Sequence, residues 1–229
     1  MGTDVTVADA ARVSFNRRSS ALSESTIHIM VDGVDTEIKI PDLQPSDKNL
    51  IKYLAEHNHW TPFGHPMITM RETVPLIVAR QRFKHTVGFV YNEVSRRYVN
   101  DDFAVFQPNG WRAADTDKKQ GSKQDEFIQY LSGRNTGIEV QEMYEYVIDT
   151  CFEAYEAMID SGVCPEQARL CLPQGMMTSY YVTGSLAAWS RAYHLRNAPD
   201  AQLEIRELAP QWKSILDTLF PVSSGYLLR

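Results

Sequence analysis

The chain has 229 residues, 43% of them hydrophobic, and carries a formal net charge of -6 at pH 7. A chain of this length and composition can bury a sizeable core, which predicts a single domain over residues 1–229. The acidic balance argues against nucleic acid or an anionic membrane as a partner, because both need a basic surface. No apolar run approaches the roughly 18 residues of a spanning helix, and the start Met1–Asp4 lacks a signal-peptide pattern.

The cysteines and histidines carry little sign of metal or disulfide chemistry. The cysteines are odd in number and include no C-x-x-C pair; they are Cys151, Cys164 and Cys171. Such usage is typical of a reducing compartment, so we expect a cytoplasmic protein without a disulfide scaffold or a zinc site. Three histidines lie within His57–His65, but Pro62 interrupts the segment and no acidic residue lies at ligand spacing. We therefore predict no metal.

The first predicted element is a β-hairpin at residues 25–41. Its alternating segments, Ile27–Val31 and Val34–Ile40, flank the dipeptide Asp32-Gly33. Asp-Gly between alternating segments is a strong signal for a tight turn, so the two segments should pair as antiparallel strands.

A helix should follow the hairpin, with Ser46 as its N-cap and its end near His57. Its apolar face recurs at helical spacing and consists of Leu50, Ile51, Leu54 and Ala55. Residues 66–74 read as extended. Pro75 suits the first turn of a further helix that runs to about His85, with Gly88 marking its end.

The second half of the chain begins with a polar segment, residues 101–135, whose stretch 115–125 is predicted to be a mobile loop. Helical spacing then predicts a long helix over residues 140–159, with Gly162 at its end. A short helix from Pro165 should carry Arg169, residues 176–183 should form a strand, and residues 185–196 and 200–219 should be helices. Strands and helices do not alternate regularly, so we predict an α/β (α+β) fold with a mixed sheet flanked by helices rather than a doubly wound sheet.

The chemistry concentrates in Arg80–Tyr98, where arginines and a lysine are interleaved with Phe83, Phe89 and Tyr91. Guanidinium groups match phosphate oxygens bidentately, so this segment suits an anionic ligand. A solvated helix face is the alternative for an ordinary run of charges. The aromatic residues within the segment and further basic clusters downstream favour a ligand site.

Five blocks, taken in order, carry a resemblance to a known family over residues 10–219. They are Ala10–Phe15 (AARVSF), His59–His65 (H-x-T-P-F-x-H), Arg80–Tyr98 (R-Q-x-F-K-H-T with N-E-x-S-x-R-Y), Ala168–Pro173 (A-R-x-x-L-P) and Leu195–Ile205 (L-R with A-Q-x-E-I). Together they resemble the flavin-dependent thymidylate synthases. The resemblance implies a single α/β domain that assembles as a homotetramer. It also implies a methyltransferase that converts dUMP to dTMP with FAD, NADPH and methylenetetrahydrofolate.

The resemblance places eight residues at positions where the family contacts dUMP: Gln81, Arg82, Lys84, Glu93, Ser95, Arg97, Arg169 and Arg196. Arg97 and Arg169 can hold a dianionic phosphate, while Arg196 falls where an arginine polarises the pyrimidine. Alternatively, one of Arg82 and Arg96 is a surface residue. The catalytic roles implied are those of Arg196, His85 and Ser95. No cysteine nucleophile is expected, and Cys171 should be a buried small hydrophobe.

Nine residues fall on or near FAD-contacting positions of the family: Ser14, His59, Thr61, Lys84, His85, Thr86, Glu93, Ser185 and Arg191. Several features depart from the family pattern. Lys84-His85-Thr86 stands in place of R-H-R, Gly64 replaces a glutamate, the stretch before Ala10 is short and the hairpin is an apparent insertion. Two alternatives stay open. One is a related flavin-dependent (hydroxy)methylase of another pyrimidine nucleotide, and the other is a catalytically silent flavin- or nucleotide-binding homologue.

Overall fold

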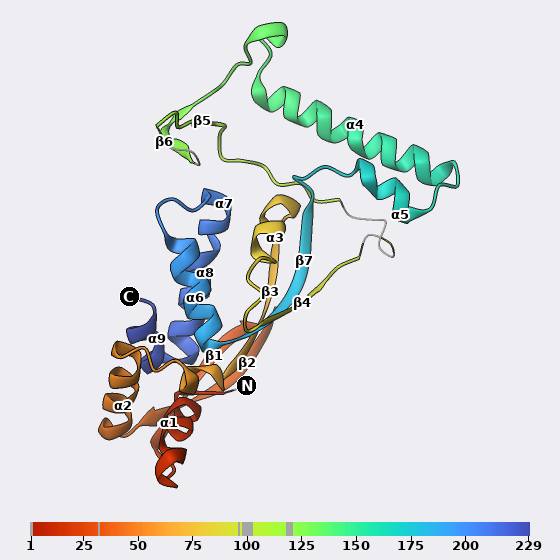
Figure 1. Ribbon diagram of the computed structural model, residues 1–229. Coiled ribbons are helices and arrows are strands. Elements are labelled where there is room, and N and C mark those ends of the chain that lie inside the picture. Colours follow the sequence, from red (N-terminus) through yellow and green to blue (C-terminus); the bar gives the residue numbers. More distant parts are fainter. Residues whose placement is uncertain (1, 32, 96, 98–102, 118–120) are drawn as a thin grey trace. The chain divides into compact units, whose positions relative to one another are not determined.

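The computed structural model describes residues 2–31, 33–95, 97, 103–117 and 121–229. The described residues form helices and small sheets that do not alternate regularly (Figure 1), which confirms the predicted mixed α/β class. Some predictions concern residues outside this description: Asp32 of the hairpin turn, Arg96 and Tyr98 of the basic segment, and residues 118–120 of the predicted loop.

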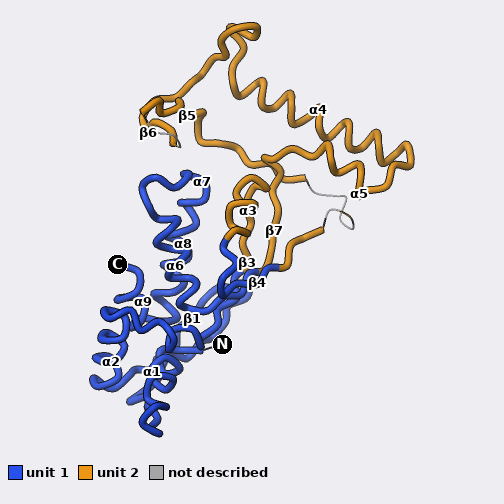
Figure 2. Tube along the Cα trace, in the orientation of Figure 1, with its two compact units in different colours: residues 1–70, 85–91, 182–229 blue, residues 71–84, 92–181 orange. Residues whose placement is uncertain are grey.

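The chain groups into two compact units (Figure 2). The first unit comprises residues 1–70, 85–91 and 182–229, and the second comprises residues 71–84 and 92–181. A three-stranded sheet has the order β3-β7-β4, and each of its strands has residues in both units: β3 (Met67–Pro75), β7 (Met177–Ser185) and β4 (Phe89–Glu93). The single domain over residues 1–229 stays a prediction.

The first unit consists of a hairpin, several short helices and a core in which aliphatic and aromatic side chains are buried. Its elements are α1 (Asp4–Arg12), η1 (Val13–Phe15), β1 (Ala21–Val31), β2 (Val34–Leu43), α2 (Pro45–Glu56), η2 (Thr61–Gly64), α6 (Leu186–Asn197), α7 (Leu203–Arg206), α8 (Leu208–Leu219) and α9 (Pro221–Leu227). Trp189 and Trp212 are buried and meet edge to face with ring centroids 5.6 Å apart. The indole of Trp189 also donates to the carbonyl of Ile68 at 3.3 Å, which satisfies its polar atom inside the core.

The hairpin prediction is confirmed and the hairpin is longer than expected. Strands β1 and β2 pair antiparallel, with Ile27 opposite Ile38 and Val31 opposite Val34. Helix α2 ends at Glu56, as expected, but Ser46 is not its N-cap. Gln44 occupies that position and Pro45 is the first helical residue, where its missing N–H costs nothing.

Helices α1 and α9 were not predicted, and a buried carboxylate joins them. Asp4, at the start of α1, is 2% exposed and accepts hydrogen bonds from the backbone N–H groups of Val222 at 2.8 Å and Ser223 at 3.0 Å. The hydroxyl of Ser223 also donates to this carboxylate. Asp4 therefore caps the first turn of α9 from more than two hundred residues away. Burial is the largest influence on Asp4 and raises its pKa above the ordinary value.

The second unit contains the longest helix. Its further elements are α3 (Leu76–Arg82), β5 (Arg112–Ala114), β6 (Ser122–Phe127), η3 (Gly133–Asn135), α4 (Val140–Asp160), α5 (Pro165–Ala168) and η4 (Arg169–Cys171). Helix α4 confirms the prediction, and Gly162 follows it with a φ of 84° that suits glycine. Tyr155 of α4 packs in a core with Ala168, Leu172 and Met176.

Three predictions about boundaries are wrong. The helix after β3 ends at Arg82 rather than near His85, with Pro75 as its N-cap and Gly88 in the turn before β4. Part of the predicted loop 115–125 is strand β6, which pairs with β5. The helix predicted over residues 200–219 is divided into α7 and α8, because Pro210 has no N–H for a helical bond and suits the first turn of a new helix.

Candidate functional site

In the first unit, the loop of residues 85–88 is fastened to helix α6. The backbone N–H of Ser185 donates to the carbonyl of Gly88 at 3.2 Å, and the guanidinium of Arg191 donates to the carbonyl of Val87. A Cβ added to Gly88 would lie 3.0 Å from the Cβ of Ala188, and the φ of Gly88 is 78°. The close approach and the left-handed backbone both require glycine at this position.

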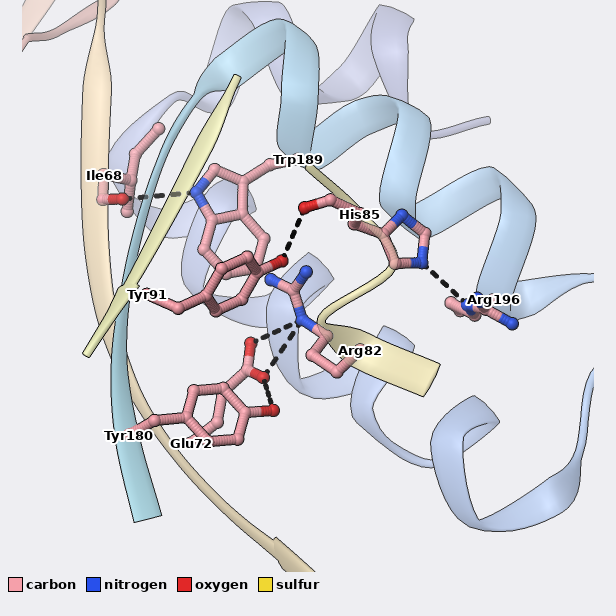
Figure 3. A network of polar contacts seen from close by, with 8 residues as sticks. All are labelled: Ile68, Glu72, Arg82, His85, Tyr91, Tyr180, Trp189 and Arg196. Carbon is pink, nitrogen blue, oxygen red and sulfur yellow. Dashed lines mark hydrogen bonds and ion pairs between the residues drawn. The ribbon is translucent and has the colours of Figure 1, made fainter. Parts of the chain in front are cut away.

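His85 is the best-defined polar side chain of this loop (Figure 3). Nε of Arg196 donates to Nε2 of His85 at 2.8 Å, and the hydroxyl of Tyr91 donates to the carbonyl of His85 at 2.8 Å. An arginine is always protonated and only donates, so Nε2 of His85 must be the acceptor. This contact assigns His85 as the neutral tautomer with its proton on Nδ1. The imidazole and the guanidinium therefore fix one another's orientation.

Among the other predicted flavin contacts of the first unit, one residue caps a helix and the others are exposed. Ser185 is 9% exposed and its hydroxyl accepts the backbone N–H of Ala188 at 3.2 Å, so it caps α6. Exposed positions on or beside η1 and η2 and in the 85–88 loop hold Ser14, His59, Thr61 and Thr86. His59 lies edge to face with Tyr53 at 5.9 Å between ring centroids.

In the second unit, two predicted phosphate-binding arginines meet at one residue. Nη1 of Arg97 pairs with a carboxylate oxygen of Glu166 at 3.1 Å, while Nε of Arg169 donates to the backbone carbonyl of Glu166 at 3.3 Å. The hydroxyl of Ser95 accepts the backbone N–H of Arg97 at 3.4 Å. Both guanidinium groups are exposed and share Glu166 as a partner, and their donors match the oxygens of a phosphate.

The remaining predicted substrate residues lie near β4 and the end of α3. Glu93 ends β4, and its carboxylate accepts the hydroxyl of Thr178 at 2.8 Å. Gln81 is half-buried and Lys84 is exposed. Thr178 was not singled out from the sequence, although alternation along residues 177–182 would place it on the buried face of its strand.

Arg82 is not a surface residue, contrary to the alternative considered for it. Its side chain is fully buried, and Nε contacts both carboxylate oxygens of Glu72 at 3.2 and 3.1 Å. The hydroxyl of Tyr180 donates to the same carboxylate at 2.5 Å (Figure 3). Glu72 and Tyr180 were not singled out from the sequence. A signal existed, because Arg82 lies four residues after the buried Val78 and therefore on the buried face of α3.

The structure thus brings the predicted residues together as two sets. His85, Arg191 and Arg196 share the 85–88 loop and α6 in the first unit. In the second unit, Arg97 and Arg169 both contact Glu166, and Ser95 accepts the backbone N–H of Arg97. Within the described residues, no group of three or more histidine, cysteine or acidic side chains is placed to hold a metal ion. The part of the chain that is described also has no helix long and apolar enough to cross a membrane.

The fold is of the mixed α/β class, and both sets of residues include guanidinium groups, whose donors match anionic ligands. A family model described as thymidylate synthase complementing protein matches residues 1–222. The flavin-dependent thymidylate synthase of Thermosipho africanus is 30% identical over 211 residues, which cover 91% of this chain and 79% of the relative. That of Thermus thermophilus is 29% identical over 223 residues, covering 97% and 71%. The chain belongs to the family of flavin-dependent thymidylate synthases, which confirms the resemblance described above.

Solved structures show the same fold. The UMP/dUMP methylase PolB from Streptomyces cacaoi, bound with 5-Br dUMP, superposes with a TM-score of 0.70 at 24% identity and covers 98% of this chain and 90% of that one. The same protein bound with 5-Br UMP gives a TM-score of 0.69 at 24% identity, covering 99% and 89%. The likeness extends over nearly the whole of both chains and concerns the fold. That the hairpin is an insertion stays a prediction.

Proposed function

We propose that this protein is an FAD-dependent thymidylate synthase that converts dUMP to dTMP, with methylenetetrahydrofolate as carbon donor and NADPH as reductant. One observation carries the proposal beyond family membership. Residues from sequence blocks far apart meet in pairs of suitable chemistry: His85 with Arg196, and Arg97 with Arg169 around Glu166. A packing role requires none of these exposed or half-buried polar groups.

The phosphate of dUMP is assigned to Arg97 and Arg169, whose guanidinium groups supply paired donors. Ser95 donates to the phosphate or to the uracil. Other nucleotide contacts are proposed for Gln81, Lys84, Glu93 and Arg196. A carboxylate and a phosphate compete for the same guanidinium, so a bound nucleotide takes Arg97 from Glu166, with which it pairs at 3.1 Å.

Arg196 acts on the pyrimidine ring. Its fixed positive charge is proposed to face the ring as negative charge develops and C5 becomes nucleophilic, because a preorganised charge of this kind lowers the barrier. His85 holds the guanidinium in place through its neutral Nε2. Protonation of His85 would remove that acceptor and place two cations side by side, so the pairing requires a neutral imidazole.

The polar groups assigned to a flavin dinucleotide come mostly from the first unit. Exposed hydroxyl, imidazole and guanidinium donors match a pyrophosphate and the edge of a planar ring. The residues assigned to FAD are Ser14, His59, Thr61, Lys84, His85, Thr86, Glu93, Ser185 and Arg191. FAD, when bound and reduced by NADPH, supplies the hydride that completes the methyl group. The hydroxyl of Ser185 already caps α6, so its assigned contribution is to orient that helix beside the ligand.

Assembly and location complete the proposal: a homotetramer in the cytoplasm. Large apolar side chains are exposed on the hairpin, with Leu22 60%, Met30 67% and Val34 64% exposed, and on α4, with Tyr146 68% exposed. Exposed apolar side chains are enriched where chains associate when they form a contiguous patch, so these residues are the candidates for subunit contacts. All three cysteines are free thiols, in keeping with a reducing compartment. A monomer by sedimentation at micromolar concentration, with FAD bound, would count against the tetramer.

The proposal is tested with the visible spectrum of the purified protein. We expect flavin absorption bands after loading with FAD, and we expect NADPH to bleach them. Titration of dUMP into the loaded protein should then show saturable binding. A colourless protein that takes up no FAD would overturn the proposal and favour the silent homologue. A yellow protein that binds another pyrimidine nucleotide but not dUMP would favour the related methylase.

A further inference from the structure

Strand β7 presents two buried polar side chains on one face. Thr178 and Tyr180 are separated by two positions and are 7% and 2% exposed, whereas Tyr181, next along the strand, is 50% exposed. Successive side chains of a strand point to opposite faces, so Thr178 and Tyr180 share the buried face. Buried hydroxyl groups need partners, and each of these two donates to a glutamate.

Tyr180 completes a buried ion pair. Arg82 and Glu72 are 0% and 5% exposed, and Nε of Arg82 contacts both carboxylate oxygens. A buried carboxylate needs hydrogen bonds beyond its ion-pair partner, and the hydroxyl of Tyr180 supplies one at 2.5 Å (Figure 3). The network therefore joins β3, which carries Glu72, to β7 and to the last residue of α3.

This network lies beside assigned nucleotide contacts. Arg82 is flanked by Gln81 and, after Phe83, by Lys84. The ring of Phe83 itself packs edge to face on Tyr180, with centroids 4.9 Å apart. Because Tyr180 contacts both Phe83 and the partner of Arg82, it fixes the backbone from which Gln81 and Lys84 extend.

Thr178 acts on a second segment from the same face. Its hydroxyl donates to the carboxylate of Glu93 at 2.8 Å. Glu93 is exposed and ends β4, so this bond selects one orientation of a side chain that would otherwise rotate freely in solvent. Strand β7 thus contacts the proposed nucleotide site at two places. Thr178 orients the side chain of Glu93, and Tyr180 fixes the backbone of residues 81–84.

We propose that Thr178 and Tyr180 are positioning residues for nucleotide binding, through which β7 fixes Glu93 and the end of α3 together. The inference rests on the proposed function, because it takes dUMP as the ligand. Under this inference, Arg82 is a positioning residue and does not make the direct nucleotide contact predicted for it. Arg82 orients its neighbours from within the core, as the charged member of the buried network.

The test compares two variants with matched controls in the FAD-loaded full chain. Tyr180→Phe removes only the hydroxyl, and its control is Tyr181→Phe on the exposed face. Thr178→Val removes the hydroxyl that holds Glu93. Its control is Thr73→Val, because Thr73 is exposed and its hydroxyl lies 2.8 Å from that of Ser179. Calorimetric titration gives the Kd for dUMP, and thermal unfolding gives Tm.

We expect Tyr180→Phe and Thr178→Val each to raise the Kd for dUMP about five- to tenfold at a temperature where both are fully folded. Both controls should stay within about twofold of the wild type. A merely structural role would lower Tm and leave the Kd of the folded protein unchanged, and that result would overturn the inference. A wild type that binds no dUMP would overturn the proposed function, and this inference with it.

A variant that does not fold is replaced by the double variant Glu72→Leu/Arg82→Met. It removes both charges and the acceptor of Tyr180 while it keeps apolar volume, so it should fold. We expect its Kd for dUMP to rise at least as much as that of Tyr180→Phe. An unchanged Kd in this double variant would equally overturn the inference.

Discussion

Replacing Arg82 by methionine should destabilise the protein strongly, because it leaves a buried carboxylate without its cation. The side chains of Arg82 and Glu72 are 0% and 4% exposed, so water does not screen or replace their interaction. The hydrogen bond from the hydroxyl of Tyr180 to Glu72 would remain, but a neutral donor does not replace a positive charge. Breaking a buried ion pair in this way costs about 3–5 kcal/mol.

The double variant Glu72→Leu/Arg82→Met separates the cost of the orphaned charge from the cost of lost packing. Replacement of both partners by apolar residues of similar volume is often neutral or stabilising. We therefore expect the double variant to recover most of the stability that Arg82→Met loses. The assay is urea unfolding followed by tryptophan fluorescence, since Trp189 and Trp212 are buried.

Two results would refute this reasoning. A loss below about 1 kcal/mol for Arg82→Met would mean that the pair behaves like a surface ion pair. If the double variant is as unstable as Arg82→Met, the loss of stability comes from altered packing and not from the unpaired carboxylate of Glu72. Either outcome would contradict the claim that a buried carboxylate without its cation destabilises the protein.

The remaining predictions concern the nucleotide site, the capping carboxylate and the cysteines. Arg169→Ala should raise the Kd for dUMP in the FAD-loaded protein at least tenfold, because a charge-assisted hydrogen bond contributes about 1.5–3 kcal/mol; an unchanged Kd in the titration would remove Arg169 from the site. Burial raises the pKa of Asp4, so its contribution to stability is fully present below the unfolded pKa of about 3.9 and is lost as pH rises through the folded pKa. In denaturant titrations, the free energy of unfolding of the wild type minus that of Asp4→Asn should therefore decrease as the pH rises through this window. An increase with pH would mean that folding lowers the pKa of Asp4. A triple variant without Cys151, Cys164 and Cys171 should retain turnover, measured by nucleotide chromatography, and a folded but inert variant would point to a cysteine nucleophile.

Local patterns predicted those elements whose signals are strong and contiguous. Apolar spacing over residues 140–159 predicted α4, and Asp-Gly between alternating segments predicted the β1–β2 hairpin. Helix α9 was missed because it is short and depends on a cap from Asp4 at the other end of the chain. Strand β6 was missed because its residues are nearly all exposed, which leaves no alternation of polar and apolar side chains to detect.

In the candidate site, too, residues within local motifs were predicted, whereas residues whose role depends on tertiary packing were missed. The family motifs pointed to His85, Arg97, Arg169 and Arg196, and the structure joins these residues in pairs. No motif pointed to Tyr180, because its role depends on the packing of one strand against a helix end. The helical spacing of Arg82 after Val78 indicated burial, but its partner Glu72 could be identified only once the fold showed which residue of β3 lies beside the end of α3.

The most direct test of the central claim follows the transferred carbon. The FAD-loaded chain is incubated with dUMP, NADPH and methylenetetrahydrofolate labelled in its methylene carbon, and the nucleotides are separated by chromatography. We expect labelled dTMP whose formation requires all three substrates, and we expect Arg196→Ala to reduce turnover more than it weakens dUMP binding. A folded, FAD-loaded protein that forms no labelled dTMP, or that forms 5-hydroxymethyl-dUMP instead, would contradict the account.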